Sequence, residues 1–87
     1  MIKKYVKKPI TIEAIQWTGF NLSEVREFTK VDKVRLIRNS SLYAIAIPTL
    51  DDNITASPGD YIIKDTNGEF YRCEPDIFNS TYDEVTE

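Results

Sequence analysis

The closing third of the sequence, from Pro58 to Val85, most constrains the fold, because residues that favour turns recur there between short apolar runs. Ser57 to Asp60 has the composition of a tight turn, so the runs Tyr61 to Lys64 and Phe70 to Cys73 are expected to be strands. Asp65 to Gly68 lies between them and fits either a type I turn with a G1 bulge or a type I′ turn. The two turns differ by one residue in register, and the sequence leaves both open.

A strand is also expected from Ile10 to Trp17. Ile10, Ile12 and Ala14 share one face of this strand because side chains alternate along it, whereas Ile15 and Trp17 fall on the opposite face. This mixed pattern predicts a β-bulge near Ala14. Burial of both faces of the strand is the alternative.

The segment from Asn21 to Lys30 is expected to form the main helix. Apolar residues recur in it at helical spacing, at Leu22, Val25 and Phe28. Asn21 is the expected N-cap, and Glu24 three residues later completes the pattern of a capping box.

Two further strands, Val34 to Arg38 and Leu42 to Ile47, are expected to form a hairpin through the polar turn from Asn39 to Ser41. The second of them is apolar almost throughout, which predicts a central position with both faces covered. Ile54 to Ala56 is expected to add a brief strand before the turn at Pro58.

After Cys73 the chain is expected to enter a short helical turn. Pro75 suits the first turn of a helix, and the carboxylate of Asp76 opposes the positive end of the helix dipole. Phe78 and Tyr82 lie four residues apart on this turn and are expected to pack back on the sheet and complete the core.

Together these elements predict one small α+β domain over residues 1–87. Its twisted, mostly antiparallel and partly rolled sheet is expected to have about five or six strands, with one helix packed on one face and a short C-terminal helical turn. A chain of 87 residues, 41% of them hydrophobic, can bury one modest core. Because so small a domain leaves much of its surface exposed, a homo-oligomer is a natural way to add burial.

The residue types that are absent limit the catalytic and metal-binding chemistry that this chain can perform. The sequence has no histidine, the commonest general base and metal ligand, and its three glycines are each expected in a turn. The single Cys73 can form neither an internal disulfide nor a thiolate zinc cage, and is expected to be a small buried hydrophobic residue in a reducing, intracellular setting. Asp51, Asp52 and Asp60 match no calcium-loop spacing and are expected to form a solvated acidic loop. We therefore expect no enzyme, no cofactor and no metal site.

Formal charge is divided between the two halves of the chain. Residues 1–38 contain nine basic and four acidic residues, whereas residues 39–87 contain two basic and ten acidic ones. We expect the two halves to pack together so that these charges form loose surface pairs. The alternative is a bipolar surface, which would favour orientation-specific docking or self-association. A candidate basic patch, which Arg35 and Arg38 could extend, consists of Lys3, Lys4, Lys7 and Lys8. Nucleic acid is nevertheless a disfavoured partner, because the acidic half repels phosphate.

A candidate binding surface is suggested by a carboxylate on a strand close to an indole ring. Its residues are Glu13, Trp17, Tyr61 and Arg72. In the small-ligand hypothesis, an oligomer interface lined by Glu13, Trp17 and Tyr61 holds a nucleotide or another metabolite. A carboxylate glycosidase or nuclease would need a second acid opposite Glu13, and since the sequence identifies none, Glu13 is expected to be an outward residue of its strand.

Motifs near both ends of the chain occur in a fixed order. They are KKPITIEAIQWTG near the start, then PGDYIIK, GEFY, Cys73, PDIF and Thr81-Tyr82. This pattern resembles a family of short proteins encoded by phages and prophages of Gram-positive bacteria, although Arg72 stands where relatives often have proline, which would change the edge of the last hairpin. The resemblance implies a phage accessory protein in the bacterial cytoplasm and assigns no catalytic residue.

The function that the sequence favours is a non-enzymatic binding module that engages a host or phage protein through a sheet edge or its charged surface. One alternative is the small-ligand binder acting as a homo-oligomer. Another is a weak nucleic-acid binder acting through the basic N-terminal segment. No run of about 18 apolar residues occurs, so no membrane segment is expected.

Overall fold

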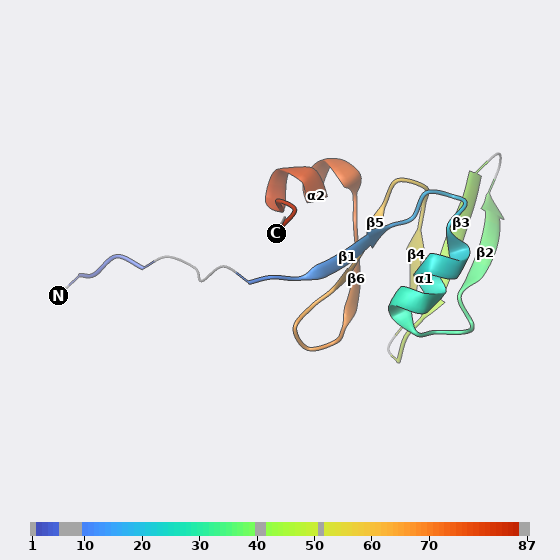
Figure 1. The fold of residues 1–87 in the computed structure, drawn as a ribbon, viewed down its shortest axis with the longest axis horizontal. Coiled ribbons are helices and arrows are strands. Elements are labelled where there is room, and N and C mark those ends of the chain that lie inside the picture. Colours follow the sequence, from blue (N-terminus) through green and yellow to red (C-terminus); the bar gives the residue numbers. More distant parts are fainter. Residues whose placement is uncertain (1, 6–9, 40–41, 51, 86–87) are drawn as a thin grey trace.

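The computed structural model describes residues 2–5, 10–39, 42–50 and 52–85. In this part of the chain six strands form two three-stranded antiparallel sheets, accompanied by two helices (Figure 1). The elements in chain order are β1 (Glu13–Gln16), α1 (Leu22–Thr29), β2 (Arg35–Asn39), β3 (Leu42–Pro48), β4 (Asn53–Ala56), β5 (Tyr61–Lys64), β6 (Phe70–Cys73) and α2 (Pro75–Thr81). Sheet A has the order β1-β5-β6, and sheet B has the order β2-β3-β4. The α+β class is confirmed, with the strands divided between two sheets.

Sheet B places its most apolar strand in the middle, as predicted. On β3, Ile45 pairs with Leu36 of β2 on one side and with Ala56 of β4 on the other. The four residues from Ala44 to Ile47 are all buried. The hairpin between β2 and β3 is confirmed by its register, in which Asn39 pairs with Leu42, while Ser40 and Ser41 of the predicted turn lie outside the described residues.

Sheet A contradicts the predicted bulge in β1. The register runs without interruption from Glu13 opposite Lys64 to Gln16 opposite Tyr61. The alternative explanation of the mixed apolar pattern holds instead: both faces of the strand are covered. Ile15 packs against the core on one face, and Ala14 lines a groove beneath α2 on the other.

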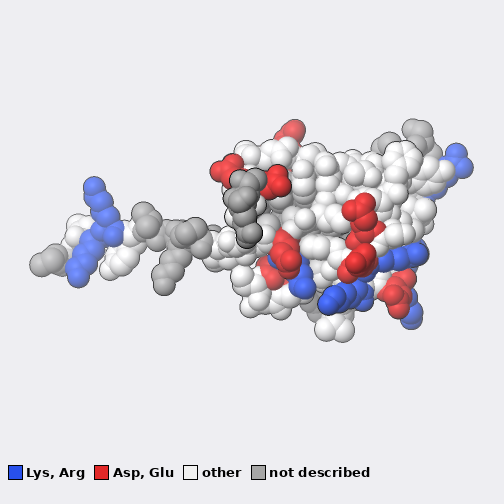
Figure 2. All heavy atoms as spheres, in the orientation of Figure 1, with Lys and Arg blue, Asp and Glu red and all other residues white. Residues whose placement is uncertain are grey.

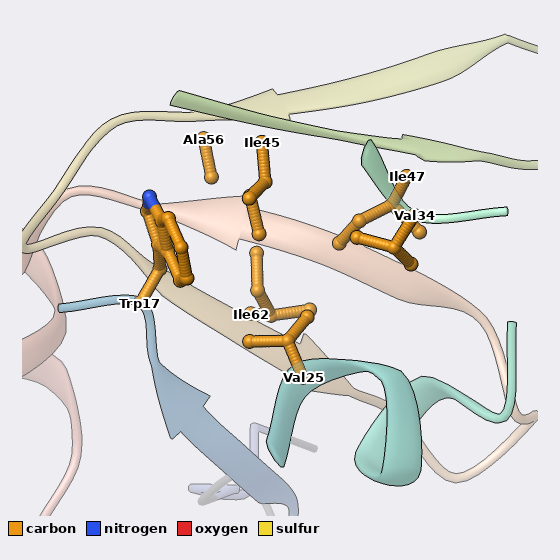
Figure 3. Close-up of a cluster of buried hydrophobic side chains, with 7 residues drawn as sticks. All are labelled: Trp17, Val25, Val34, Ile45, Ile47, Ala56 and Ile62. Carbon is orange, nitrogen blue, oxygen red and sulfur yellow. The ribbon is translucent and has the colours of Figure 1, made fainter. Parts of the chain in front are cut away.

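Seven fully buried side chains form the core between the two sheets and α1. They are Trp17, Val25, Val34, Ile45, Ile47, Ala56 and Ile62. Figure 3 shows Ile45 of sheet B pointing toward Ile62 of sheet A, with Val25 of α1 beside them. Burial of one large aliphatic side chain contributes about 1.5 to 3 kcal/mol, so this cluster is the main apolar source of stability.

Helix α1 matches the predicted segment within a residue, but its first turn lacks the predicted side-chain cap. The side chain of Asn21 makes no capping hydrogen bond to the helix. Its Oδ1 accepts hydrogen bonds from the backbone N–H of Thr18 at 2.9 Å and from the Thr18 hydroxyl at 3.0 Å, and its Nδ2 donates to the carbonyl of Gln16 at 2.9 Å. The predicted capping box is therefore wrong, because the amide of Asn21 closes the loop that leads from β1 into the helix.

The hydrogen bonds and backbone angles of the β5–β6 hairpin decide between the two turn types that the sequence left open. The N–H of Gly68 donates to the carbonyl of Asp65 at 3.1 Å, and the N–H of Asp65 donates to the carbonyl of Glu69 at 2.9 Å. Gly68 has a φ of 82°, whereas Asn67 is not among the residues with positive φ, as a type I′ turn would require. The turn is thus type I with a G1 bulge.

Candidate functional site

A groove of about 590 Å³ lies on the outer face of sheet A, beneath α2. Its walls come from three parts of the chain: the segment that leads into β1, the start of β5, and α2 with the residues that follow it. Its aromatic and large aliphatic lining residues are Ile10, Ile12, Tyr61, Phe78, Tyr82 and Val85. The three rings are called the aromatic floor, and Ala14 with the polar residues Thr11, Asn79, Asp83 and Glu84 completes the lining. Apolar side chains with a few polar groups are the usual lining of a recognition site.

The aromatic floor results from the way α2 folds back after β6. Pro75 starts the helix, where the missing N–H of proline has no cost, and Asp76 lies in its first turn. The ring of Phe78 stacks on Tyr61, with ring centroids 3.8 Å apart and planes 6° from parallel. Tyr82 lies next to Phe78 at 5.0 Å between ring centroids. Phe78 packs on the sheet as predicted, with Tyr82 against it, but the prediction that the two residues complete the core is wrong, because they form a separate half-buried cluster on the opposite face.

The opposite wall follows from the alternation of side chains ahead of β1. Ile10, Ile12 and Ala14 have the same parity and all line the groove, with the side chain of Ile10 57% exposed. Because β1 is an edge strand of sheet A, no described strand pairs with its outer edge. An extended ligand in the groove would therefore have both apolar side chains and a strand edge within reach.

The rim of the groove is acidic. Asp83 and Glu84 line it and are exposed, and from Glu74 to Val85 the sequence contains four acidic residues and no lysine or arginine. Figure 2 shows acidic side chains, and no basic one, on the visible side of the region that α2 occupies in Figure 1. A cationic ligand is thus favoured at this end of the molecule.

The four residues of the predicted binding surface do not form one site. Tyr61 lies in the groove. Glu13 is exposed, as expected, and pairs with Lys64 on β5. The prediction that Trp17 belongs to a binding surface is wrong, because its side chain is fully buried and its Nε1 donates to the carbonyl of Tyr43 at 3.0 Å. The interface proposed for a small ligand therefore lacks its indole wall.

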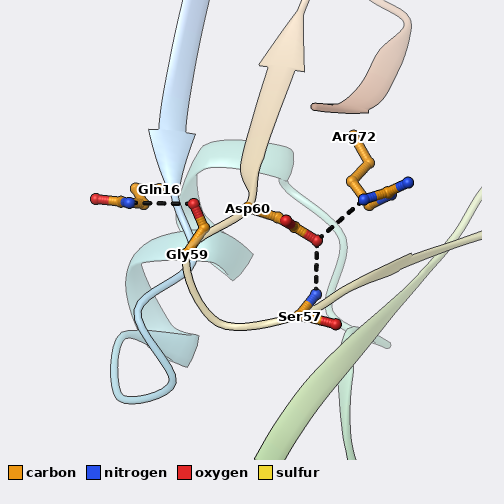
Figure 4. Close-up of polar contacts among 5 residues, drawn as sticks. All are labelled: Gln16, Ser57, Gly59, Asp60 and Arg72. Carbon is orange, nitrogen blue, oxygen red and sulfur yellow. Dashed lines mark hydrogen bonds and ion pairs between the residues drawn. The ribbon is translucent and has the colours of Figure 1, made fainter. Parts of the chain in front are cut away.

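Arg72 has a structural partner at the start of β5. Its guanidinium lies 3.3 Å from Oδ2 of Asp60, a carboxylate whose side chain is 9% exposed (Figure 4). The same oxygen of Asp60 accepts a hydrogen bond from the N–H of Ser57 at 2.9 Å. Asp60 thus serves the turn between β4 and β5, which corrects its assignment to a solvated acidic loop.

The predicted basic patch is only partly described. Lys3 and Lys4 are exposed on an arm that extends away from the two sheets, whereas Lys7 and Lys8 lie outside the described residues (Figures 1 and 2). The strand β2, which carries Arg35 and Arg38, lies at the far end of the molecule from this arm (Figure 1). The suggested extension of the patch toward these arginines is therefore wrong.

The remaining chemically distinctive residues are dispersed. Cys73 is half-buried on the edge strand β6, so the prediction of a buried side chain is met only in part. Asp52 is exposed, and Asp51 lies outside the described residues. Within the described ranges no three His, Cys, Asp or Glu side chains gather in a way that could hold a metal ion.

A second, smaller groove of about 340 Å³ lies between the β3–β4 loop and the β5–β6 hairpin. Its wall includes Tyr71, whose hydroxyl donates to Oε2 of Glu69 at 2.7 Å. This hydrogen bond, together with the negative charge of Glu69, raises the pKa of Tyr71 to about 12. Its aromatic side chains are fewer than in the larger groove, although the edge strands β4 and β6 also border it.

Comparison with known proteins adds no relative. The chain matches no protein family, no curated protein and no solved structure. The resemblance to phage and prophage proteins therefore stays a prediction. Neither described helix has the length and apolar character needed to cross a membrane.

The groove was not predicted as a site, although its two walls were visible in the sequence. The period-two spacing of Ile10, Ile12 and Ala14 and the four-residue spacing of Phe78 and Tyr82 were each noted separately. Nothing in the sequence indicates that these two patterns lie against each other, since 63 positions separate Ile12 from Pro75, where α2 begins.

Proposed function

We propose that this protein is a non-enzymatic binding module that holds an extended segment of a host or phage protein in the groove beneath α2. The observation that carries the proposal is the apolar, aromatic groove beside the edge strand β1. Extended peptides bind such places by adding main-chain hydrogen bonds to the strand edge while alternate side chains enter apolar pockets.

The chemistry of the groove specifies the kind of segment that fits. Asp83 and Glu84 on the rim favour lysine or arginine in the ligand. The rings of Tyr61, Phe78 and Tyr82 favour aliphatic or aromatic side chains, and their faces can also attract a cation. We therefore expect a segment in which basic residues alternate with aromatic or aliphatic ones.

Selection from a displayed peptide library tests this proposal. Peptides selected on the wild-type protein are expected to be basic and apolar in alternation, and to bind more weakly as salt rises from about 0.1 M to about 1 M. The matched variants are Val85→Ser, in the groove, and Leu50→Ser, an exposed apolar residue outside it. We expect Val85→Ser to weaken binding by about tenfold and Leu50→Ser to leave it unchanged, as fluorescence anisotropy with labelled peptides would show.

A clear result contradicts the proposal. If the selected peptides share no basic and apolar pattern, or if Val85→Ser and Leu50→Ser bind them equally well, the groove is not the binding site.

A further inference from the structure

We infer that the groove takes the N-terminal arm of a second copy of this chain, so that two copies exchange arms in a symmetric dimer. The arm is defined here as residues 2–5. The inference rests on the proposed function of the groove and names one occupant of it.

All four residues of the arm are exposed. Ile2 and Tyr5 are 98% and 86% exposed, although both carry large apolar side chains. Figure 1 shows the arm leading away from both sheets, and the molecule measures 56 Å along its longest axis against 27 and 26 Å along the others. The Cα radius of gyration is 15.2 Å, whereas a compact chain of this length has about 12 Å. An extended apolar arm of this kind gains stability only when another surface covers it.

Charge makes the groove a complementary surface for the arm. The arm carries Lys3 and Lys4 and no acidic residue, whereas the rim of the groove carries Asp83 and Glu84. Ile2 and Tyr5 add an aliphatic and an aromatic side chain, and because they lie on opposite faces of an extended arm, one of them can face the floor that Phe78 and Tyr82 form. The arm thus combines basic and apolar residues, the two residue types that the groove is proposed to bind.

The position of the groove favours exchange between two copies. Ile10, Thr11 and Ile12, which follow the arm in the chain, already form one wall of the groove. Figure 1 shows the arm directed away from α2 and sheet A, so the arm does not lie in the groove of its own copy. The groove of a second copy, related by a twofold axis, can lie where the arm extends, so that each copy covers the arm of the other. Twofold pairing of this kind uses the same surface twice and closes on itself.

Exchange also predicts how partner binding is regulated. A partner segment of the same chemistry must displace the arm before it enters the groove. Partner affinity is then reduced by the fraction of grooves that the arms already occupy, and this fraction rises with protein concentration.

A charge-exchange experiment tests the dimer on the full chain. One variant carries Lys3→Glu and Lys4→Glu, and the other carries Asp83→Lys and Glu84→Lys. Each variant alone pairs like charges in both grooves, so we expect its dimer to be weaker by about tenfold or more than that of the wild type. In an equimolar mixture both grooves meet arms of opposite charge, and we expect the dimer to return. Sedimentation velocity from low micromolar to near millimolar protein measures the dimerisation of the wild type, of each variant and of the mixture.

Matched controls separate the arm from general charge effects. Lys33→Glu with Arg35→Glu makes the same charge change on exposed residues outside the arm and groove, and is expected to leave the wild-type dimer unchanged. The inference is overturned by a wild type that stays monomeric at the highest concentration. It is equally overturned by charge variants that dimerise as the wild type does, or by a mixture that fails to restore association.

Peptide binding to the Lys3→Glu, Lys4→Glu variant distinguishes this inference from the function on which it rests. If this variant binds the selected peptides in the groove while the wild type remains a monomer, the binding module stands and the arm exchange is wrong. If it binds no such peptide and the wild type remains a monomer, both are wrong. A dimeric wild type whose arm variant binds the peptides more tightly supports both, because the arm then competes with the partner.

Discussion

At the scale of single residues, Gly59 shows how one backbone position sets the path between the two sheets. It has a φ of 101° and follows Pro58, and the N–H of Asp60 donates to the carbonyl of Ser57 at 3.0 Å, as in a type II turn. The N–H of Gly59 donates to the carbonyl of Trp17, and its own carbonyl accepts from Nε2 of Gln16 at 3.1 Å (Figure 4). The turn that leads from β4 to β5 is thereby tied to β1.

Substitution of Gly59 by alanine is expected to lower the free energy of unfolding by about 1 to 2 kcal/mol, because an L-residue is strained at this φ. Space is not the cause, since a Cβ at Gly59 would lie 3.8 Å from Cγ of Pro75. Urea denaturation measures the change. Ser57→Ala, in the same turn at an exposed position, is the control and is expected to change stability by less than about 0.5 kcal/mol. Equal stability of the two variants would contradict this account of the turn.

Tyr71 is expected to titrate above the ordinary pKa of tyrosine. Its pKa of about 12 lies above the ordinary value of 10.0 because its hydroxyl donates to the carboxylate of Glu69. The folded state therefore favours the protonated phenol, and the resulting contribution to stability is present below about pH 10 and disappears as pH rises through about 12. NMR titration of the tyrosine rings measures this pKa. Glu69→Gln is expected to return it toward 10.0, and an unchanged value would show that the hydrogen bond is not the cause.

At the scale of elements, α2 depends on its contact with the sheet. It has seven residues, none of them fully buried, and a helix this short is not stable alone in water. The stacking of Phe78 on Tyr61 is the main contact that holds it in place. Since α2 carries one wall of the groove, the stability of this contact and the shape of the site are coupled.

Phe78→Ala is expected to lower the free energy of unfolding by about 1 to 2 kcal/mol, less than for a fully buried phenylalanine because the ring is only half-buried. It is also expected to abolish peptide binding in the groove. Ile77→Ala is the control on the same helix, where the side chain is 55% exposed and does not line the groove. Thermal unfolding followed by circular dichroism measures stability. If Phe78→Ala lowers stability no more than Ile77→Ala does, the stacking role of Phe78 is contradicted.

At the scale of the whole molecule, the two sheets share one core. Trp17, which directly follows β1 of sheet A, donates to the carbonyl of Tyr43 in sheet B, and Ile62 of sheet A belongs to the same buried cluster as Ile45 of sheet B. Neither three-stranded sheet can bury its apolar face without the other. The two sheets are therefore expected to unfold together.

This cooperativity can be measured with two probes. Trp17 is the only tryptophan, so its fluorescence reports on the contact between the sheets, and far-ultraviolet circular dichroism reports on the strands and helices. The two urea transitions are expected to coincide, as they do in a two-state domain. Separate midpoints would show that one sheet keeps its structure after the shared core opens.

The sequence determined the local structure well, because turns, caps and periodic apolar runs are decided by neighbouring residues. The strands β5 and β6 were predicted to the residue, and α1, β4 and the central place of β3 nearly so. The choice of a G1 bulge at Gly68 was open in the sequence, since it depends on backbone angles that both turns allow. Asn21 is the N-cap residue, as predicted, but its side chain does not cap the helix because its amide has a competing partner in the loop before the helix.

Only the tertiary structure decided which patterns meet. Both faces of β1 are covered because α2 returns over sheet A, and no local signal at Ile10 to Trp17 records the presence of a helix more than 50 positions later. For the same reason the sequence placed Trp17 at a binding surface, whereas packing of the two sheets buries it. Side-chain alternation is a property of neighbouring residues, but burial depends on which distant segment covers each face. The groove beneath α2 and its acidic rim are products of that long-range packing.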